Sequence, residues 1–251
     1  MPALRHCQIL CAAALLLAAA GMARGEEVMF RRDVMAVLSK AGCNAGGCHG
    51  NGNGKGGFKL SLRGQDPDLD WLAMTREQGG RRVNLIEPEK SLLVLKATAA
   101  LAHEGGQRFA AGSPEHAIFL SWLRDGAPDS GANAAKLVKL EVVAPERVLV
   151  EPVVETKLRA MAKFADGTER EVTRLAVYEP TNLLARVSHD GLVTREKAGE
   201  TTVLVRYLEQ QVAVPLAFVP ARPDFVWSEP ATNNFIDGHV FKKLRDRKSV
   251  V

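Results

Sequence analysis

Residues 43–57 read CNAGGCHGNGNGKGG, and the organisation of the chain can be worked out from this stretch in both directions. Nearly half of its residues are glycine and most others are small or polar, which predicts an irregular loop. Within that loop stand Cys43, Cys48 and His49, the densest group of reactive side chains in the sequence. The stretch therefore predicts an irregular loop that carries a chemical site, with regular structure on either side.

Cys43, Cys48 and His49 form a C-x4-C-H motif. Two thiols followed directly by an imidazole are typical of c-type haem attachment, usually spaced C-x-x-C-H. The longer spacer here contains Gly46 and Gly47, which accept backbone angles that other residues avoid and so let it bulge. The motif predicts one covalent haem c, with Cys43 and Cys48 as the thioether residues and His49 as the proximal iron ligand.

Three other interpretations of the same residues stay open at this point. A Cys43–Cys48 disulfide is the simplest state of two cysteines in an oxidising compartment. A zinc site would need two further ligands from elsewhere in the chain. A phosphate-binding loop over Gly50–Gly57 is disfavoured, because no strand precedes it and no Lys-Ser/Thr pair ends it.

Residues 26–128 are predicted to form a small all-α domain around this loop. Apolar residues recur at helical spacing, Ala41-Gly42 ends the first segment, and Ser113-Pro114 is a typical helix start. The helices are expected at 30–40, 68–77, 91–101 and 113–126.

After a turn-rich linker at residues 129–136, the period changes from helical to alternating. About seven short strands are predicted within residues 137–220, which suffices for a β-sandwich of two antiparallel sheets. The fold class is therefore multidomain, an all-α domain followed by an all-β one, with two cores that share no hydrophobic face. Residues 221–251 are predicted to be a connector and a helix at 234–247. The strands are expected at 139–143, 147–150, 155–164, 183–187, 192–193, 199–208 and 212–219.

Residues 1–25 have the pattern of a secretory signal peptide. Arg5 supplies the positive charge, Ile9–Ala20 the apolar segment, and Ala23-Arg24-Gly25 a cleavage site. The apolar segment is shorter than the roughly 20 residues that cross a bilayer, although a retained N-terminal anchor is the alternative. We expect an exported protein of the periplasm or cell surface, with no transmembrane segment in the mature chain.

The charge of the chain argues against one class of partner. The formal net charge is +4, from 33 basic and 29 acidic residues, and the basic residues are scattered among acidic ones. This pattern does not predict nucleic-acid binding.

Several segments beyond the motif resemble the planctomycete-type cytochrome c domain at the start of large secreted proteins. In that family a bacterial immunoglobulin-like (group 2) domain often follows, which Thr168–Val205 resembles, and Asn233–Leu244 resembles the opening of the next domain. The resemblance implies that this chain is the N-terminal part of a larger secreted protein. The segments that carry it in the first domain are Gly54–Gly64 (GKGGFKLSLRG), Pro88–Leu93 (PEKSLL), His103–Phe109 (HEGGQRF) and Trp122–Pro128 (WLRDGAP).

The resemblance leaves the sixth iron ligand to be chosen. Related cytochromes place Met in the loop before the last helix, whereas this chain has His103 there. His103 is therefore the expected ligand, with Met74 and His116 as alternatives, and His/His ligation favours a lower potential than His/Met. Arg108 is a candidate partner for a haem propionate.

The function expected from these observations is electron transfer through one haem, without enzymatic activity in this part of the protein. The redox partner is unknown. The alternative is a cell-surface adhesion or scaffold protein with a structural or sensory haem, in which the β-sandwich binds a glycan or protein.

Overall fold

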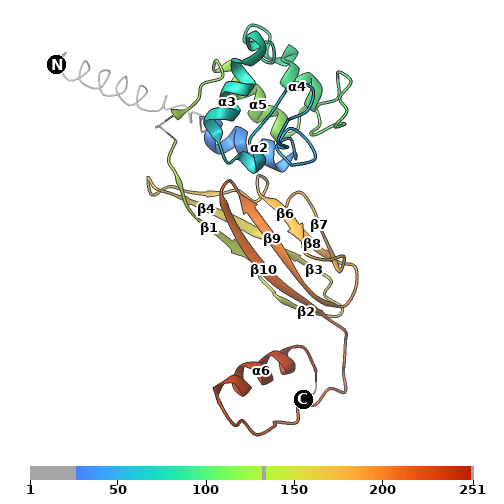
Figure 1. The fold of residues 1–251 in the computed structure, drawn as a ribbon. Coiled ribbons are helices and arrows are strands. Elements are labelled where there is room, and N and C mark those ends of the chain that lie inside the picture. The colour runs from blue at the N-terminus through green and yellow to red at the C-terminus, as the bar shows by residue number, and fades with distance from the viewer. Residues whose placement is uncertain (1–26, 132–133, 250–251) are drawn as a thin grey trace, which may run out of the picture.

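The computed structural model describes residues 27–131 and 134–249, so the predicted signal peptide lies outside the described residues. Figure 1 shows a helical half, a β-rich region beside it and one further helix beyond the β-rich region. The chain is thus a mixed structure of helices and β-sheets. Within the described residues, no helix is long and apolar enough to cross a membrane.

The helical half begins with a π-helical turn that continues directly into helix α2 and leads to Cys43. Capping explains two later starts: Asp66 accepts from Leu69 N at 3.0 Å, and Ser113 accepts from His116 N at 3.3 Å. The helix predicted at 91–101 ends early, because Ala99 adopts a left-handed φ of 59°. The elements are η1 (Phe30–Val34), α2 (Met35–Lys40), η2 (Leu62–Gly64), α3 (Pro67–Thr75), η3 (Glu77–Gly80), η4 (Pro88–Lys90), α4 (Leu92–Ala97) and α5 (Pro114–Arg124).

The β-rich region contains ten strands among the described residues, in three hydrogen-bonded sheets ordered β1-β4-β5, β2-β10-β9-β6 and β3-β8-β7. The prediction of two purely antiparallel sheets is therefore wrong in part. Strand β2 runs parallel to β10, while the other pairings are antiparallel. The single strand predicted at 155–164 is divided by Leu158 into β3 and β4. Strands β5 and β6 were not predicted, because they are too short and too exposed to show an alternating pattern. The strands are β1 (Leu137–Val143), β2 (Val148–Val150), β3 (Glu155–Lys157), β4 (Arg159–Phe164), β5 (Glu169–Glu171), β6 (Val177–Pro180), β7 (Ala185–Val187), β8 (Leu192–Arg195), β9 (Gly199–Tyr207) and β10 (Gln210–Val219).

The last helix, α6 (Phe235–Asp246), begins with a capping box. Asn234 Oδ1 accepts from Asp237 N at 3.4 Å, and Asp237 Oδ2 accepts from Asn234 N at 3.1 Å. None of its residues is buried. Its polar link to the β-rich region is Glu200, which pairs with Lys243 at 3.2 Å and Arg247 at 2.5 Å.

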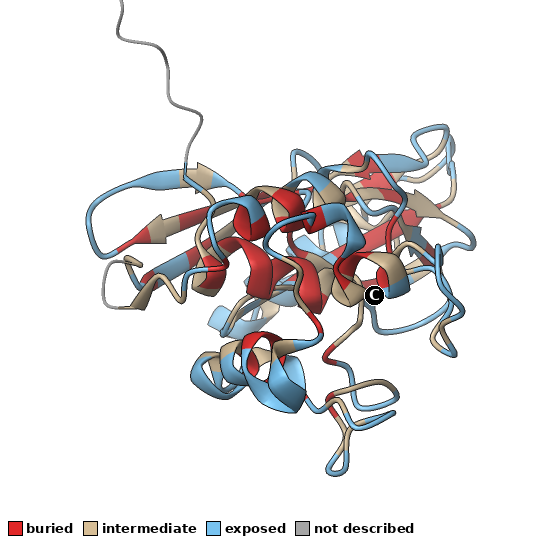
Figure 2. Ribbon diagram, turned by 90° about the horizontal axis from the view of Figure 1, so that it is seen from above, coloured by how far each residue is buried: buried red, intermediate tan, exposed pale blue. Residues whose placement is uncertain are grey.

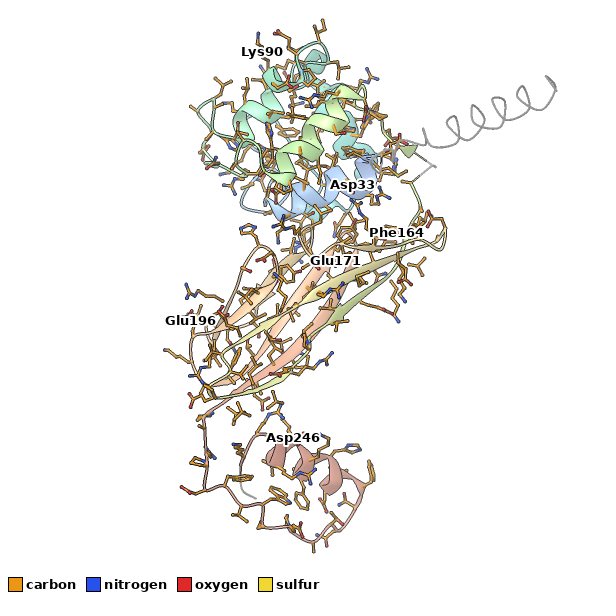
Figure 3. The ribbon with its side chains drawn as sticks, turned by 180° about the vertical axis from the view of Figure 1, so that it is seen from behind. Asp33, Lys90, Phe164, Glu171, Glu196 and Asp246 are labelled. Carbon is orange, nitrogen blue, oxygen red and sulfur yellow. The ribbon has the colours of Figure 1, made fainter. Side chains whose placement is uncertain are left out.

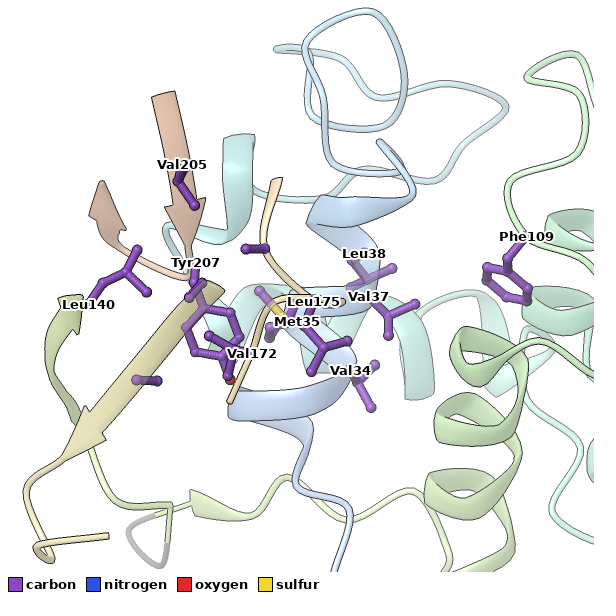
Figure 4. Close-up of a cluster of buried hydrophobic side chains, with 14 of the residues drawn as sticks. Val34, Met35, Val37, Leu38, Phe109, Leu140, Val172, Leu175, Val205 and Tyr207 are labelled. Atoms are coloured by element: carbon purple, nitrogen blue, oxygen red, sulfur yellow. The ribbon is translucent and has the colours of Figure 1, made fainter. Parts of the chain in front are cut away.

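The buried apolar side chains of the two halves form one continuous cluster, so the prediction of two separate cores is wrong. Figure 4 shows Val34, Met35 and Val37 of the first helix beside Val172 and Leu175 of the β-rich region. Figure 2 shows buried residues concentrated on the helices and strands, with exposed loops around them. The change of sequence period marks a change of secondary structure, and the core continues across it.

Polar contacts reinforce this junction. Lys40 Nζ, at the end of α2, donates to the carbonyl oxygens of Ala176 at 2.5 Å and His189 at 2.7 Å. Asp33 is 1% exposed and pairs with Arg170 of β5. Figure 3 labels Asp33 where the helical half meets the β-rich region, close to Glu171. The helical segment that leads into the cysteine motif is therefore bonded at both ends, through Asp33 and Lys40, to the β-rich region.

Candidate cofactor site

A cavity of about 490 Å³ lies in the helical half, and Cys43, Cys48, His49, His103 and Arg108 all line it. Its size is within the range of about 300–1,000 Å³ that is usual for small-molecule and cofactor sites. The sequence places these side chains up to sixty-five positions apart, and the fold brings them to one space. Apolar walls complete it, formed by Leu38, Phe58, Leu92, Leu93, Ala97, Phe109 and Phe119.

Backbone hydrogen bonds hold the glycine-rich loop in a defined shape. His49 N donates to Cys43 O at 3.0 Å, and Leu60 N donates to His49 O at 2.8 Å. Gly50 is required by close approach, since a Cβ there would lie 2.0 Å from Asn44 O. The loop is irregular, as its composition predicts, and these bonds fix the position of His49.

The His49 imidazole is oriented by Phe58. Its Nδ1 lies 3.0 Å from Phe58 O, and the two rings are 4.6 Å apart between centroids. A carbonyl only accepts hydrogen bonds, so Nδ1 carries the proton and Nε2 keeps a free lone pair. Burial lowers the pKa of His49, and the charges of His103 and Arg82 act in the same direction, whereas the backbone carbonyls of Phe58 and Lys55 act against them. The neutral imidazole has the form that a metal ligand needs.

His103 faces the same cavity and has the same tautomer. Its Nδ1 lies 2.9 Å from Gly106 O, which again leaves Nε2 free. The centroids of the two imidazoles are 6.1 Å apart and the ring planes differ by 11°. Two metal–nitrogen bonds of about 2 Å separate the centroids of a shared metal's imidazoles by about 6 Å. The centroid distance is therefore compatible with both rings binding one metal ion.

Both cysteines of the motif are free thiols of intermediate burial, and no disulfide joins them. Burial raises the pKa of the Cys43 thiol to about 12, although the charge of Arg108 acts in the opposite direction. Cys43 is thus a neutral thiol at physiological pH, held on the wall of the cavity.

The polar part of the cavity wall is predominantly basic. Glu104 is the acidic residue of the described lining, and it pairs with Lys55 at 3.4 Å. Arg108 Nε is buried and lacks a hydrogen-bond partner among the described residues. A buried guanidinium nitrogen without a partner is costly unless an acceptor comes with a ligand. Free thiols, imidazole nitrogens, apolar walls and an unpaired cation together fit a haem with anionic propionates. The basic lining residues are Lys55, Arg81, Arg82, Lys96 and Arg108.

The alternative sixth ligands lie elsewhere. Met74 of α3 is completely buried in the hydrophobic cluster and does not line the cavity. His116 of α5 also lies off the cavity wall, and its Nδ1 accepts from Gly112 N at 3.2 Å. Within residues 27–131 and 134–249, no three His, Cys, Asp or Glu side chains are grouped to hold a metal ion by themselves.

Phe58 and Arg82 belong to the site but were missed by reasoning from the sequence. Phe58 gives His49 both a carbonyl acceptor and a ring contact. Arg82 lies over the Phe58 ring at 4.5 Å. The available signal for Phe58 was its position directly after the glycine-rich loop, whereas nothing near Arg82 in the sequence marks it.

Comparisons with known proteins give little beyond this geometry. No family model matches the chain, and no curated protein matches it. Two solved structures of the surface-layer protein SbsC, one of them covering its domains 1–6, are 21% and 20% identical over 35% of this chain. The matched part spans 15% of each of those chains, and the TM-score is 0.28 in both cases. A similarity at that score supports no conclusion about fold or function.

Proposed function

We propose that the chain is an exported c-type cytochrome module that binds one haem through Cys43, Cys48 and His49 and transfers electrons. The observation that carries the proposal is the cavity, where the motif meets a second imidazole 6.1 Å from the first. Cys43 and Cys48 would hold the haem through thioethers, and His49 and His103 would bind its iron. Arg108, whose Nε lacks a partner among the described residues, would bind a propionate.

A haem held there supplies one-electron exchange at its iron. Among the protein residues, Phe58 and Gly106 orient the two imidazoles, and Leu38, Phe109 and Phe119 would give the haem an apolar contact surface. Ligation by two imidazoles favours a lower potential than ligation by His and Met. We propose that this part of the protein has no enzymatic activity.

The β-rich region would be the immunoglobulin-like domain of a planctomycete-type cytochrome protein. Its place in the proposal is mechanical, since it packs beneath the helix that leads into the motif. The resemblance to that family and the signal-peptide pattern support export, to the periplasm or cell surface.

The decisive experiment is expression with a cytochrome c maturation system, followed by mass spectrometry under denaturing conditions. The expected mass is that of the processed chain plus one haem, retained after acid and organic solvent. A mass without haem, or with the two hydrogens lost to a Cys43–Cys48 disulfide, would refute the proposal.

The sixth ligand is tested separately on the haem-loaded protein. His103→Ala should convert a low-spin spectrum to high-spin and allow added imidazole to bind the iron. His116→Ala is the matched control, because His116 lies off the cavity wall. An unchanged spectrum in His103→Ala would remove His103 from the site.

A further inference from the structure

Arg82 is the most deeply buried charged side chain of the cavity wall, with 5% of its surface exposed. A buried guanidinium needs partners to offset its lost hydration. Its two terminal nitrogens donate to Ala73 O and to Gly57 O, each at 2.6 Å. One side chain thus ties helix α3 to the end of the glycine-rich loop.

The same guanidinium is linked to His49 through one residue. It lies over the Phe58 ring at 4.5 Å, a geometry in which a planar cation is attracted to the aromatic face. The Phe58 ring contacts the His49 ring at 4.6 Å, and Phe58 O accepts from His49 Nδ1 at 3.0 Å. Arg82, Phe58 and His49 therefore form a continuous chain of contacts.

We propose that Arg82 is a positioning residue for His49: through Phe58 it holds the imidazole as the Nδ1–H tautomer with Nε2 free. A second consequence rests on the proposed haem function. A positive charge this close to an iron ligand would disfavour the more positive ferric iron, so Arg82 would raise the reduction potential, with the half-exposed Glu77, 3.5 Å from Arg82 Nη1, opposing that effect.

The positioning role is tested first on the full chain without haem, by nitrogen-15 NMR of the histidine rings at a pH where imidazole is neutral. The wild type should show His49 as one Nδ1–H tautomer. Arg82→Gln should give a mixture of the Nδ1–H and Nε2–H tautomers of His49. Arg82→Lys keeps the charge but loses the planar guanidinium, so it should give a smaller fraction of the Nε2–H tautomer. Arg124→Gln is the control, since Arg124 is an exposed arginine of α5 that lies off the cavity wall. A wild-type tautomer in Arg82→Gln would overturn the proposal.

A mutant cycle covers the case in which Arg82→Gln fails to fold. Phe58→Leu removes the ring between the two residues and keeps the backbone carbonyl. If Arg82 acts through Phe58, the effects of Arg82→Lys and Phe58→Leu on the tautomer ratio are not additive in free energy. Additive effects would overturn the proposed route.

The charge effect is tested by potentiometry on the haem-loaded protein. Arg82→Gln should lower the potential, Arg82→Lys should stay closer to the wild type, and Arg124→Gln, off the cavity wall, should leave it nearly unchanged. A potential in Arg82→Gln equal to that of the wild type would refute the charge effect. Failure of the wild type to attach haem would refute the proposed function instead, and the NMR comparison would still decide the positioning role.

Discussion

The helical half surrounds a cavity of about 490 Å³ with short helices and loops, whereas the β-rich region fills its interior with alternating side chains from paired strands. Their buried polar groups differ as well. Those of the β-rich region are threonines, while the helical half buries the ionisable groups Asp33, Asp70 and Arg82.

This difference indicates that the two regions are stabilised by different kinds of contact. Strands β9 and β10 pair continuously from Gln210 opposite Tyr207 to Phe218 opposite Gly199, so much of the β-rich region is held by its own backbone pairing. The apolar wall of the cavity offers surface against which a ligand can pack. We therefore expect a ligand to stabilise the helical half far more than the β-rich region, except where the shared core transmits the effect.

The largest effect is expected from removing both thiols. Cys43→Ser/Cys48→Ser should abolish covalent haem attachment and lower the thermal midpoint of the helical half, because the cavity walls lose their partner. Mass spectrometry and tryptophan fluorescence measure this, since Trp71 and Trp122 lie in the helical half. The single variants are the matched controls, each keeping one thioether. Full haem mass in the double variant would contradict the covalent site.

A smaller effect is expected from Gly105→Ala. The added Cβ would lie 2.9 Å from His103 Cε1 and 3.2 Å from Arg108 Nη2, so the imidazole must move. In the haem-loaded protein the low-spin fraction should fall, which absorption spectroscopy measures. Gly52→Ala is the control, since nothing lies within 4 Å of its Cβ. Equal spectra for both variants would show that His103 tolerates the displacement.

The shared core is tested with Asp33→Asn. The substitution replaces the carboxylate that faces Arg170 by a neutral amide. Breaking a buried ion pair in this way lowers the free energy of unfolding by about 3 kcal/mol. Chemical denaturation should show this loss of stability, with the two halves unfolding in separate steps. Asp68→Asn is the control, because Asp68 pairs with Arg31 at the surface and an exposed pair contributes less than about 1 kcal/mol. A single unfolding step of unchanged stability in Asp33→Asn would argue against coupling at this junction.

The smallest effect is expected from Lys40, and it depends on pH. Burial lowers the pKa of Lys40 to about 8 from an ordinary 10.5. Between those values the unfolded chain binds a proton that the folded chain does not, so this residue makes stability rise with pH. The difference in unfolding free energy between the wild type and Lys40→Met should therefore grow from pH 8 to pH 10 in favour of the wild type. Lys90→Met, on an exposed side chain, should show no such trend.

Local features of the fold could be predicted from the sequence because their causes lie within a few residues. The caps at Ser113 and Asn234 place the starts of α5 and α6, and the glycine content of residues 43–57 gives an irregular loop. The long alternating segments became β9 and β10, whereas the short strands β5 and β6 offered too few residues for a period.

The sequence by itself determined the chemical inventory: two thiols and an imidazole at fixed spacing, a candidate second imidazole at His103, and a change from helical to alternating period. Only the tertiary structure decided that His103 lies 6.1 Å from His49, that Arg82 reaches His49 through Phe58, and that one core runs through both halves. The physical reason is the distance along the chain over which each kind of interaction acts. Caps, turns and periodicity act between neighbours in the chain, while packing depends on which faces of distant segments meet, and no local pattern records that.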